Sequence, residues 1–145
     1  MWQRIQTLYL GIATILVAAL FWSDVARIAL PDGGIENVRY TSRTIYLVWV
    51  ILLTVLQVLC LGGYKWRMKQ LRMTIVTAIM CLGFQGWLAY DYFRLQDEMT
   101  FSFTILFPAA ASILDFIASR NIFLDEAIVQ SANRLRSSRK TKKQK

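Results

Sequence analysis

Four uninterrupted apolar segments constrain this chain more than any other feature of its sequence, because each is long enough to cross a lipid bilayer. They cover about residues 5–22, 45–63, 73–90 and 101–118. A helix rises about 1.5 Å per residue, so roughly 17 to 25 apolar residues cross the hydrocarbon core. The apolar residues run on without alternation, which argues against barrel strands. The sequence therefore predicts an all-α polytopic membrane protein with a four-helix bundle as its transmembrane domain, over residues 1–120.

Composition supports this class. Of 145 residues, 56% are hydrophobic and 18% charged, and the mean hydropathy is +0.40, above what a soluble domain normally carries. The links between the segments are short, and the first holds about twenty residues, too few for a folded domain outside the membrane. Pro108 lies inside the fourth segment, where its missing N–H predicts a kink unless neighbouring groups compensate.

Basic residues predict the orientation, because they gather on one side of the four segments. Of the 17 Lys and Arg residues, 13 fall on the side of the two chain ends. They are Arg4, Lys65, Arg67, Lys69, Arg72, Arg120 and the seven basic residues from Arg134 to Lys145. The other side holds Arg27, Arg39, Arg43 and Arg94 among most of the acidic residues. By the positive-inside rule, both termini are expected in the cytoplasm.

Two motifs at the ends of the chain resemble a known family. Residues 2–10 read WQRIQTLYL, and residues 125–136 read DEAIVQSANRLR. Both resemble signatures of an uncharacterised bacterial four-helix membrane family catalogued only as a domain of unknown function, and the likeness covers nearly the whole chain. The resemblance implies the inner membrane of a Gram-negative bacterium. It implies no activity.

The residues that catalysis usually needs are scarce. The chain has no histidine, which excludes His-dependent triads, imidazole metal sites and the usual proton shuttles. Its two cysteines, Cys60 and Cys81, lie within apolar segments and lack the spacing of a redox or zinc site. We therefore expect no enzymatic activity, no cofactor and no metal site.

Asp115 is the acidic residue that stands out within the apolar segments. Placing it at a helix centre costs about 2.5 to 3.5 kcal/mol on insertion scales, although it lies toward the cytoplasmic end of its span. Counting along the segments puts Gln57 at a similar depth. The predicted intramembrane polar layer consists of Asp115, Gln57, Arg4, Tyr9 and Arg120.

Two interpretations of this layer remain open. In the structural one, Asp115 pairs with Arg4 or Arg120, or bonds to Gln57, and so fixes which helix faces inward. In the functional one, Asp115 binds and releases a proton or a cation. We favour the structural interpretation, because Asp115 is a single acid near the interface and relays usually chain several.

The segment after the fourth span is predicted to leave the membrane as an amphipathic helix over residues 121–136. Leu124, Ile128, Ala132 and Leu135 recur at helical spacing on one face. This helix could lie on the leaflet, fold against the second link or dock a partner. The candidate partner or lipid contacts are Asp125, Glu126, Arg134, Leu135 and Arg136. Residues 137–145 are polar and basic and are predicted to be disordered.

The function that these features favour is that of an accessory or scaffold subunit, acting through helix packing and its cytoplasmic tail. The alternative is a small oligomeric transporter or channel that uses Asp115. Expected partners are an anionic inner leaflet, a membrane or cytoplasmic protein, or further copies of the chain. The tail lacks the interleaved aromatic residues that stack on bases, so nucleic acid is disfavoured.

Overall fold

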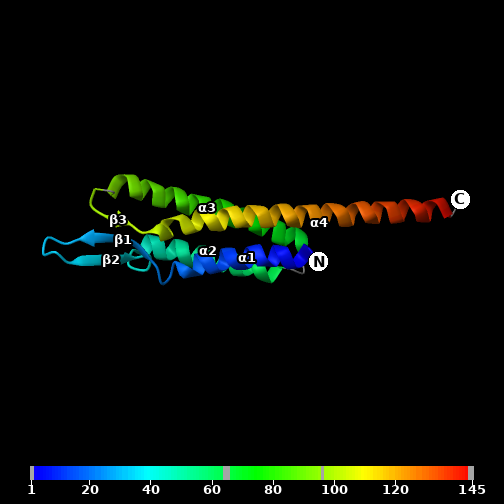
Figure 1. The fold of residues 1–145 in the computed structure, drawn as a ribbon. Coiled ribbons are helices and arrows are strands. Elements are labelled where there is room, and N and C mark those ends of the chain that lie inside the picture. Colours follow the sequence, from blue (N-terminus) through cyan, green and yellow to red (C-terminus); the bar gives the residue numbers. More distant parts are fainter. Residues whose placement is uncertain (1, 64–65, 96, 144–145) are drawn as a thin grey trace.

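The computed structural model describes residues 2–63, 66–95 and 97–143 and is mostly helical. Its long helices are α1 (Trp2–Ala19), α2 (Thr44–Gly62), α3 (Arg67–Leu95) and α4 (Phe107–Lys143). All four are long and apolar enough to cross a membrane, as the sequence predicts. They lie side by side (Figure 1), and the neighbouring pairs are α1–α2, α2–α3, α3–α4 and α4–α1. The two remaining pairs, α1–α3 and α2–α4, are therefore diagonal.

The helices define two ends of the molecule. The start of α1, the end of α2 and the start of α3 lie at one end, which we call the N-terminal end (Figure 1). The connections between α1 and α2 and between α3 and α4 lie at the other end, which we call the sheet end. Helix α4 begins near the sheet end and projects well past the N-terminal end.

Helix α4 combines two elements that the sequence analysis predicts as separate. The fourth span and the amphipathic segment 121–136 are one continuous helix, which extends to Lys143 across most of the segment predicted to be disordered. No Gly or Pro follows Pro108, and Lys, Arg and Gln are good helix formers, so nothing in the sequence ends this helix locally. The projecting part beyond residue 125 is roughly 27 Å long at 1.5 Å per residue.

Pro108 occupies the first turn of α4, not the interior of a helix. The preceding residues form the short 3-10 helix η2 (Phe103–Leu106), and α4 begins at Phe107. Proline is well suited to a first turn, where its missing N–H has no helical partner to lose. The next N–H, that of Ala109, donates to Gln85 Oε1 on α3 at 3.1 Å. Gln85 thereby satisfies one of the free donors at the start of the helix.

A small antiparallel sheet makes the all-α prediction incomplete. Its strands are β1 (Asp24–Ala29), β2 (Ile35–Arg39) and β3 (Thr100–Phe101), in the order β2-β1-β3. Strands β1 and β2 form a hairpin whose turn contains Gly33 at φ +78°, a conformation that glycine adopts without strain. The sheet thus ties the connection between α1 and α2 to the connection between α3 and α4, although each is short.

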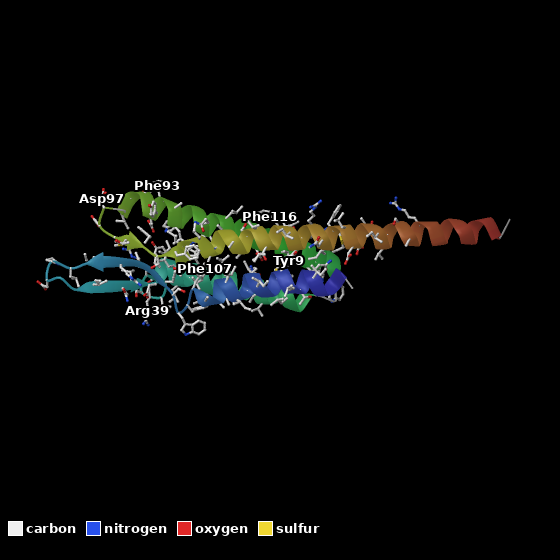
Figure 2. All side chains as sticks on the ribbon, in the orientation of Figure 1. Tyr9, Arg39, Phe93, Asp97, Phe107 and Phe116 are labelled. Atoms are coloured by element: carbon white, nitrogen blue, oxygen red, sulfur yellow. The ribbon has the colours of Figure 1, made fainter. Side chains whose placement is uncertain are left out.

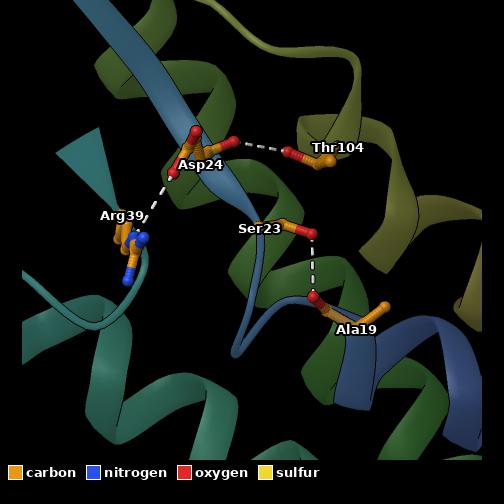
Figure 3. Close-up of polar contacts among 5 residues, drawn as sticks. All are labelled: Ala19, Ser23, Asp24, Arg39 and Thr104. Carbon is orange, nitrogen blue, oxygen red and sulfur yellow. Dashed lines mark hydrogen bonds and ion pairs between the residues drawn. The ribbon is translucent and has the colours of Figure 1, made fainter. Parts of the chain in front are cut away.

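Polar contacts attach this sheet to the helices (Figure 3). Thr104 Oγ1 donates to the carbonyl oxygen of Asp24 at 2.7 Å, and Ser23 Oγ donates to the carbonyl oxygen of Ala19 at the same distance. Arg39 Nε lies 3.7 Å from Asp24 Oδ1 in a surface ion pair. Strand β1 is therefore held on both sides by groups from distant parts of the chain.

The interior at the sheet end is an apolar core built around aromatic rings. Phe84 on α3 stacks on Trp49 with ring centroids 5.6 Å apart and contacts Tyr40 and Tyr46 edge-on. Burial raises the pKa of Tyr40 to about 12, and the nearby Thr104 hydroxyl offsets part of that rise. The other fully buried members include Ala13, Val17, Leu20, Val25, Ala26, Val50, Leu53, Cys81, Leu88 and Ala111.

Candidate functional site

Buried polar side chains distinguish the rest of the interior. Among the described residues, those classed as buried are Gln6, Gln57, Gln70, Thr74, Thr77, Ser112, Asp115 and Ser119. They come from all four helices and lie from the middle of the molecule to its N-terminal end. We call this set the polar interior. Such groups are costly in a membrane helix unless they are hydrogen-bonded to one another or to backbone.

Gln57 and Asp115 form the centre of the polar interior. Gln57 Nε2 on α2 donates to Asp115 Oδ2 on α4 at 2.7 Å, and both side chains are fully buried. Because α2 and α4 are diagonal to each other, this bond crosses the middle of the molecule. The amide oxygen of Gln57, Oε1, and the other carboxyl oxygen of Asp115, Oδ1, have no hydrogen-bond partner among the described residues.

The other buried groups around this pair are satisfied. Thr77 Oγ1 donates to the carbonyl oxygen of Met73 and lies 3.4 Å from Cys60 Sγ. Gln70 Nε2 donates to the carbonyl oxygen of Cys60 at 3.0 Å. Ser112 Oγ donates to the carbonyl oxygen of Ala78 at 3.2 Å, which links α4 to α3. The two unpaired oxygens of Gln57 and Asp115 are therefore exceptional in this region.

A second polar pair joins α1 to α4 nearer the N-terminal end. Gln6 Nε2 donates to Asp125 Oδ2 at 2.8 Å, and Gln6 is 7% exposed. Asp125 was predicted to contact a partner or lipid, whereas here it binds another part of its own chain. Gln6 is absent from the predicted site. Both residues lie in the two end motifs, 2–10 and 125–136, and that shared location was the available signal.

Two further residues of the predicted polar layer, Tyr9 and Arg120, make no hydrogen bond or ion pair with Asp115 among the contacts of the described residues. Tyr9 is half-buried and packs with Leu10, Cys60 and Ala118 (Figure 2). Arg120 is exposed, and among the described residues no ion pair joins it to Asp115. The side chain of Arg4 lies outside the described residues. Of the groups proposed to hold Asp115, the structure thus brings only Gln57 into contact with it, among those it describes.

Helix α4 exposes apolar side chains where it begins to project past the other helices. Phe123, Leu124, Ile128 and Val129 are each more than 40% exposed, and Ile128 reaches 65%. Among the predicted contacts, Arg134 is exposed, and Glu126 accepts a hydrogen bond from Gln130 within the same helix. The side chains of Leu135 and Arg136 lie outside the described residues. No described element packs against this part of α4 beyond its first turns.

An open cavity of about 500 Å³ lies at the sheet end. Its lining comes from β1, β3 and η2 and includes Trp22, Asp24, Arg27 and Thr104. Two of its polar groups are already engaged, since Asp24 pairs with Arg39 and Thr104 donates to the Asp24 carbonyl. The cavity therefore offers few free groups with which to fix a ligand.

Comparison with known proteins gives a match at the level of the family. The family model described as DUF4293, a domain of unknown function, matches residues 2–135. This range includes α1, α2, α3, the sheet, most of α4, the N-terminal motif and all but the last residue of the C-terminal motif. No curated protein and no solved structure matches the chain. The match confirms the resemblance to a family of unknown function.

Proposed function

This chain belongs to the DUF4293 family, and we propose that it is a non-enzymatic accessory or scaffold subunit of the bacterial inner membrane. In this proposal, four helices anchor the protein, and the projecting part of α4 binds another protein. The observation that carries the proposal is the exposed apolar surface of α4 around residue 125, where the projecting part begins, formed by Leu124, Ile128 and Val129. Exposed apolar clusters of this kind on a regular helix are typical of interaction sites.

The charge distribution supports an orientation with both termini in the cytoplasm. Basic residues gather around the N-terminal end and along the projecting helix, whereas Asp24, Asp91 and Asp97 lie toward the sheet end. Reporter fusions at each terminus and in the β1–β2 hairpin test this orientation. Both terminal fusions should report the cytoplasm and the hairpin fusion the opposite side; the reverse pattern would overturn it.

The direction of α4 favours a protein partner over the leaflet. A helix that binds the membrane surface lies in the plane of the interface, with its apolar face among the headgroups. Here the projecting part continues the line of the rest of α4 (Figure 1), and we infer that it points away from the bilayer. We infer that the partner presents an apolar groove, with acidic groups placed to meet Arg134.

A pair of matched substitutions tests this surface. Ile128→Glu places a charge in the exposed apolar surface, whereas Gln130→Glu places the same charge on the opposite side of the same helix. Site-specific crosslinking in native membranes should lose a defined protein adduct with Ile128→Glu and retain it with Gln130→Glu. Equal adducts from both variants would count against the proposal, and crosslinks to lipid alone would indicate leaflet binding.

A small oligomeric transporter or channel is the second candidate. The observation that favours it is the unpaired Oδ1 atom of Asp115 in the middle of the molecule, since intramembrane carboxylates often mark ion pathways. Proteoliposomes that contain the purified protein test this candidate. A pH-dependent ion flux that is lost with Asp115→Asn would support transport, and the absence of flux would exclude it.

A further inference from the structure

The two unpaired oxygens at the centre of the polar interior require a donor. Gln57 Oε1 and Asp115 Oδ1 are both inaccessible to solvent. An amide oxygen can only accept a hydrogen bond, and so can the oxygen of an ionised carboxylate. Leaving such an atom buried without a donor is costly, and the cost rises steeply when it carries charge. The two oxygens therefore need a hydrogen-bond donor that an ionised Asp115 and Gln57 do not supply.

We propose that Gln57 and Asp115 form a proton-binding site, in which a proton on Asp115 Oδ1 is donated to Gln57 Oε1. A carboxylic acid and a primary amide each have one donor and one acceptor side by side, so they can form two antiparallel hydrogen bonds. The first of these, from Gln57 Nε2 to Asp115 Oδ2, is present at 2.7 Å. One bound proton completes the second and satisfies both unpaired atoms.

A proton fits this site better than a metal cation. Hard cations bind six or more oxygen ligands, and the two unpaired oxygens fall far short of that number. The neighbouring hydroxyls of Thr77 and Ser112 are turned toward backbone carbonyls as donors. In the part of the chain that the structure describes, no group of three or more His, Cys, Asp or Glu residues is placed to hold a metal.

The surroundings offer no countercharge for an ionised Asp115. The titratable side chains that interact with it electrostatically are Cys60 on α2 and Cys81 on α3, whose thiols carry no positive charge, and Tyr9 on α1 packs against Leu10, Cys60 and Ala118. Arg120 on α4 is exposed. Among the described side chains, no cation faces the carboxyl group, so a proton is the positive charge that can neutralise it.

Buried side chains close the site on both sides along the helices. Leu10, Cys60 and Ala118 are fully buried between Asp115 and the N-terminal end, alongside the hydrogen-bonded Gln70 and Thr74, and the aromatic core lies toward the sheet end. The proton can therefore exchange with water only when the helices separate locally. Loss of the proton would leave a charge between the diagonal helices α2 and α4, so proton occupancy and the packing of these helices are linked.

Infrared spectroscopy of the full chain in liposomes tests the proposal directly. The protein labelled with ¹³C-aspartate should show, at neutral pH, the carbonyl band of a protonated carboxylic acid, and Asp115→Asn should lose it. Cys81 lies beside Gln57 and is a weak alternative donor, so Cys81→Ala is the matched control and should keep the band. A spectrum with only carboxylate bands would overturn the proposal, as would a band that survives in Asp115→Asn.

A second measurement covers the case in which Asp115→Asn does not fold. Dicyclohexylcarbodiimide enters membranes and reacts with protonated carboxyl groups, so it should modify Asp115 in the unaltered protein, as located by mass spectrometry. Gln57→Leu removes the partner and should speed this reaction. Absence of modification in both proteins would overturn the proposal. Ile128→Glu should leave the infrared band unchanged, which separates this test from the proposed role of α4.

Discussion

The two halves of the interior are held together by different interactions. At the sheet end, Tyr40, Tyr46, Trp49 and Phe84 pack ring against ring in an apolar core. Toward the N-terminal end, the contacts between helices include hydrogen bonds such as Gln57–Asp115 and Gln6–Asp125. In a bilayer, lipid tails are as apolar as the core, so packing depends on shape complementarity, whereas a polar contact depends on a specific partner.

This difference gives the two halves different tolerance to change. A well-packed apolar core loses stability with the volume removed, whichever residue supplies it. A polar pair loses stability when one partner is removed, and recovers part of it when both are replaced by apolar residues. Substitutions at the sheet end are thus expected to lower stability according to the side-chain volume removed. Substitutions toward the N-terminal end are expected to lower it according to whether a polar partner is left unpaired.

The largest expected effect is at the sheet end. Phe84→Ala removes a fully buried ring that contacts three other aromatic residues, and it should lower the unfolding free energy by about 3 to 5 kcal/mol. Equilibrium unfolding in mixed detergent micelles measures this loss. Phe93→Ala, at a ring that is 72% exposed, is the control and should change little. Equal losses from both variants would remove the basis of the comparison.

The next effect concerns the diagonal pair. Gln57→Leu or Asp115→Leu alone leaves a buried partner unpaired and should cost about 1 to 3 kcal/mol. The double variant should be more stable than the sum of the single losses predicts, with a coupling of roughly 0.6 to 1.7 kcal/mol. The same unfolding assay on all four proteins gives the coupling. Strict additivity would show that the two side chains do not act as a pair.

A smaller effect is expected where the sheet meets the helices. Thr104→Val removes the hydroxyl that bonds the Asp24 carbonyl and should cost about 0.5 to 1.5 kcal/mol. Thr54→Val makes the same substitution where the hydroxyl bonds the Val50 carbonyl within its own helix. That carbonyl keeps its helical partner, so the control should lose less. Hydrogen exchange of the β1 amides should rise in Thr104→Val alone.

The smallest effect is expected at the rim of the polar interior. Gln6→Ala breaks the bond to Asp125 between α1 and α4 and should cost roughly 0.6 kcal/mol, the average for hydrogen bonds between membrane helices. Gln130→Ala breaks an exposed bond within one helix and should cost about 0.2 to 0.5 kcal/mol. A loss from Gln6→Ala as large as that from Phe84→Ala would contradict the division between the two halves.

The spans were predictable because hydropathy reports contact with lipid directly. Helix α2 occupies Thr44–Gly62, within one residue of the predicted 45–63. Helix α3 covers Arg67–Leu95 and exceeds the predicted 73–90, because its polar ends are helical without being apolar. Hydropathy therefore locates the part of a helix that is apolar enough to cross a membrane, and the helix itself can continue beyond it.

The sheet was missed for two reasons of different kinds. The β1–β2 hairpin carries a visible signal, since Pro31, Asp32, Gly33 and Gly34 separate two short runs with β-branched residues. Strand β3 carries none, because two residues are too few to show a period and their partner on β1 lies more than seventy residues earlier. A strand this short is defined by its hydrogen bonds to β1 and not by a pattern in its own sequence.

The sequence predicts how far along the helices the candidate site lies. It does not predict which side chains face one another there. Counting along the spans places Gln57 and Asp115 at one level, but three groups could have held the carboxyl. Choosing among them requires the rotation of each helix, which these continuously apolar spans encode weakly. Gln6 lies so close to the predicted start of its span that it resembled an interfacial residue.

The strand order β2-β1-β3 has a consequence for biosynthesis. The hairpin can form once the link between α1 and α2 has been synthesised, yet the third strand of the sheet follows α3 in the chain. Strand β1 therefore keeps one edge unpaired until α3 and residues 100–101 have been synthesised and have reached the same end of the molecule. Closure of this small sheet would then mark a late step of folding, reached only when both connections lie at the sheet end.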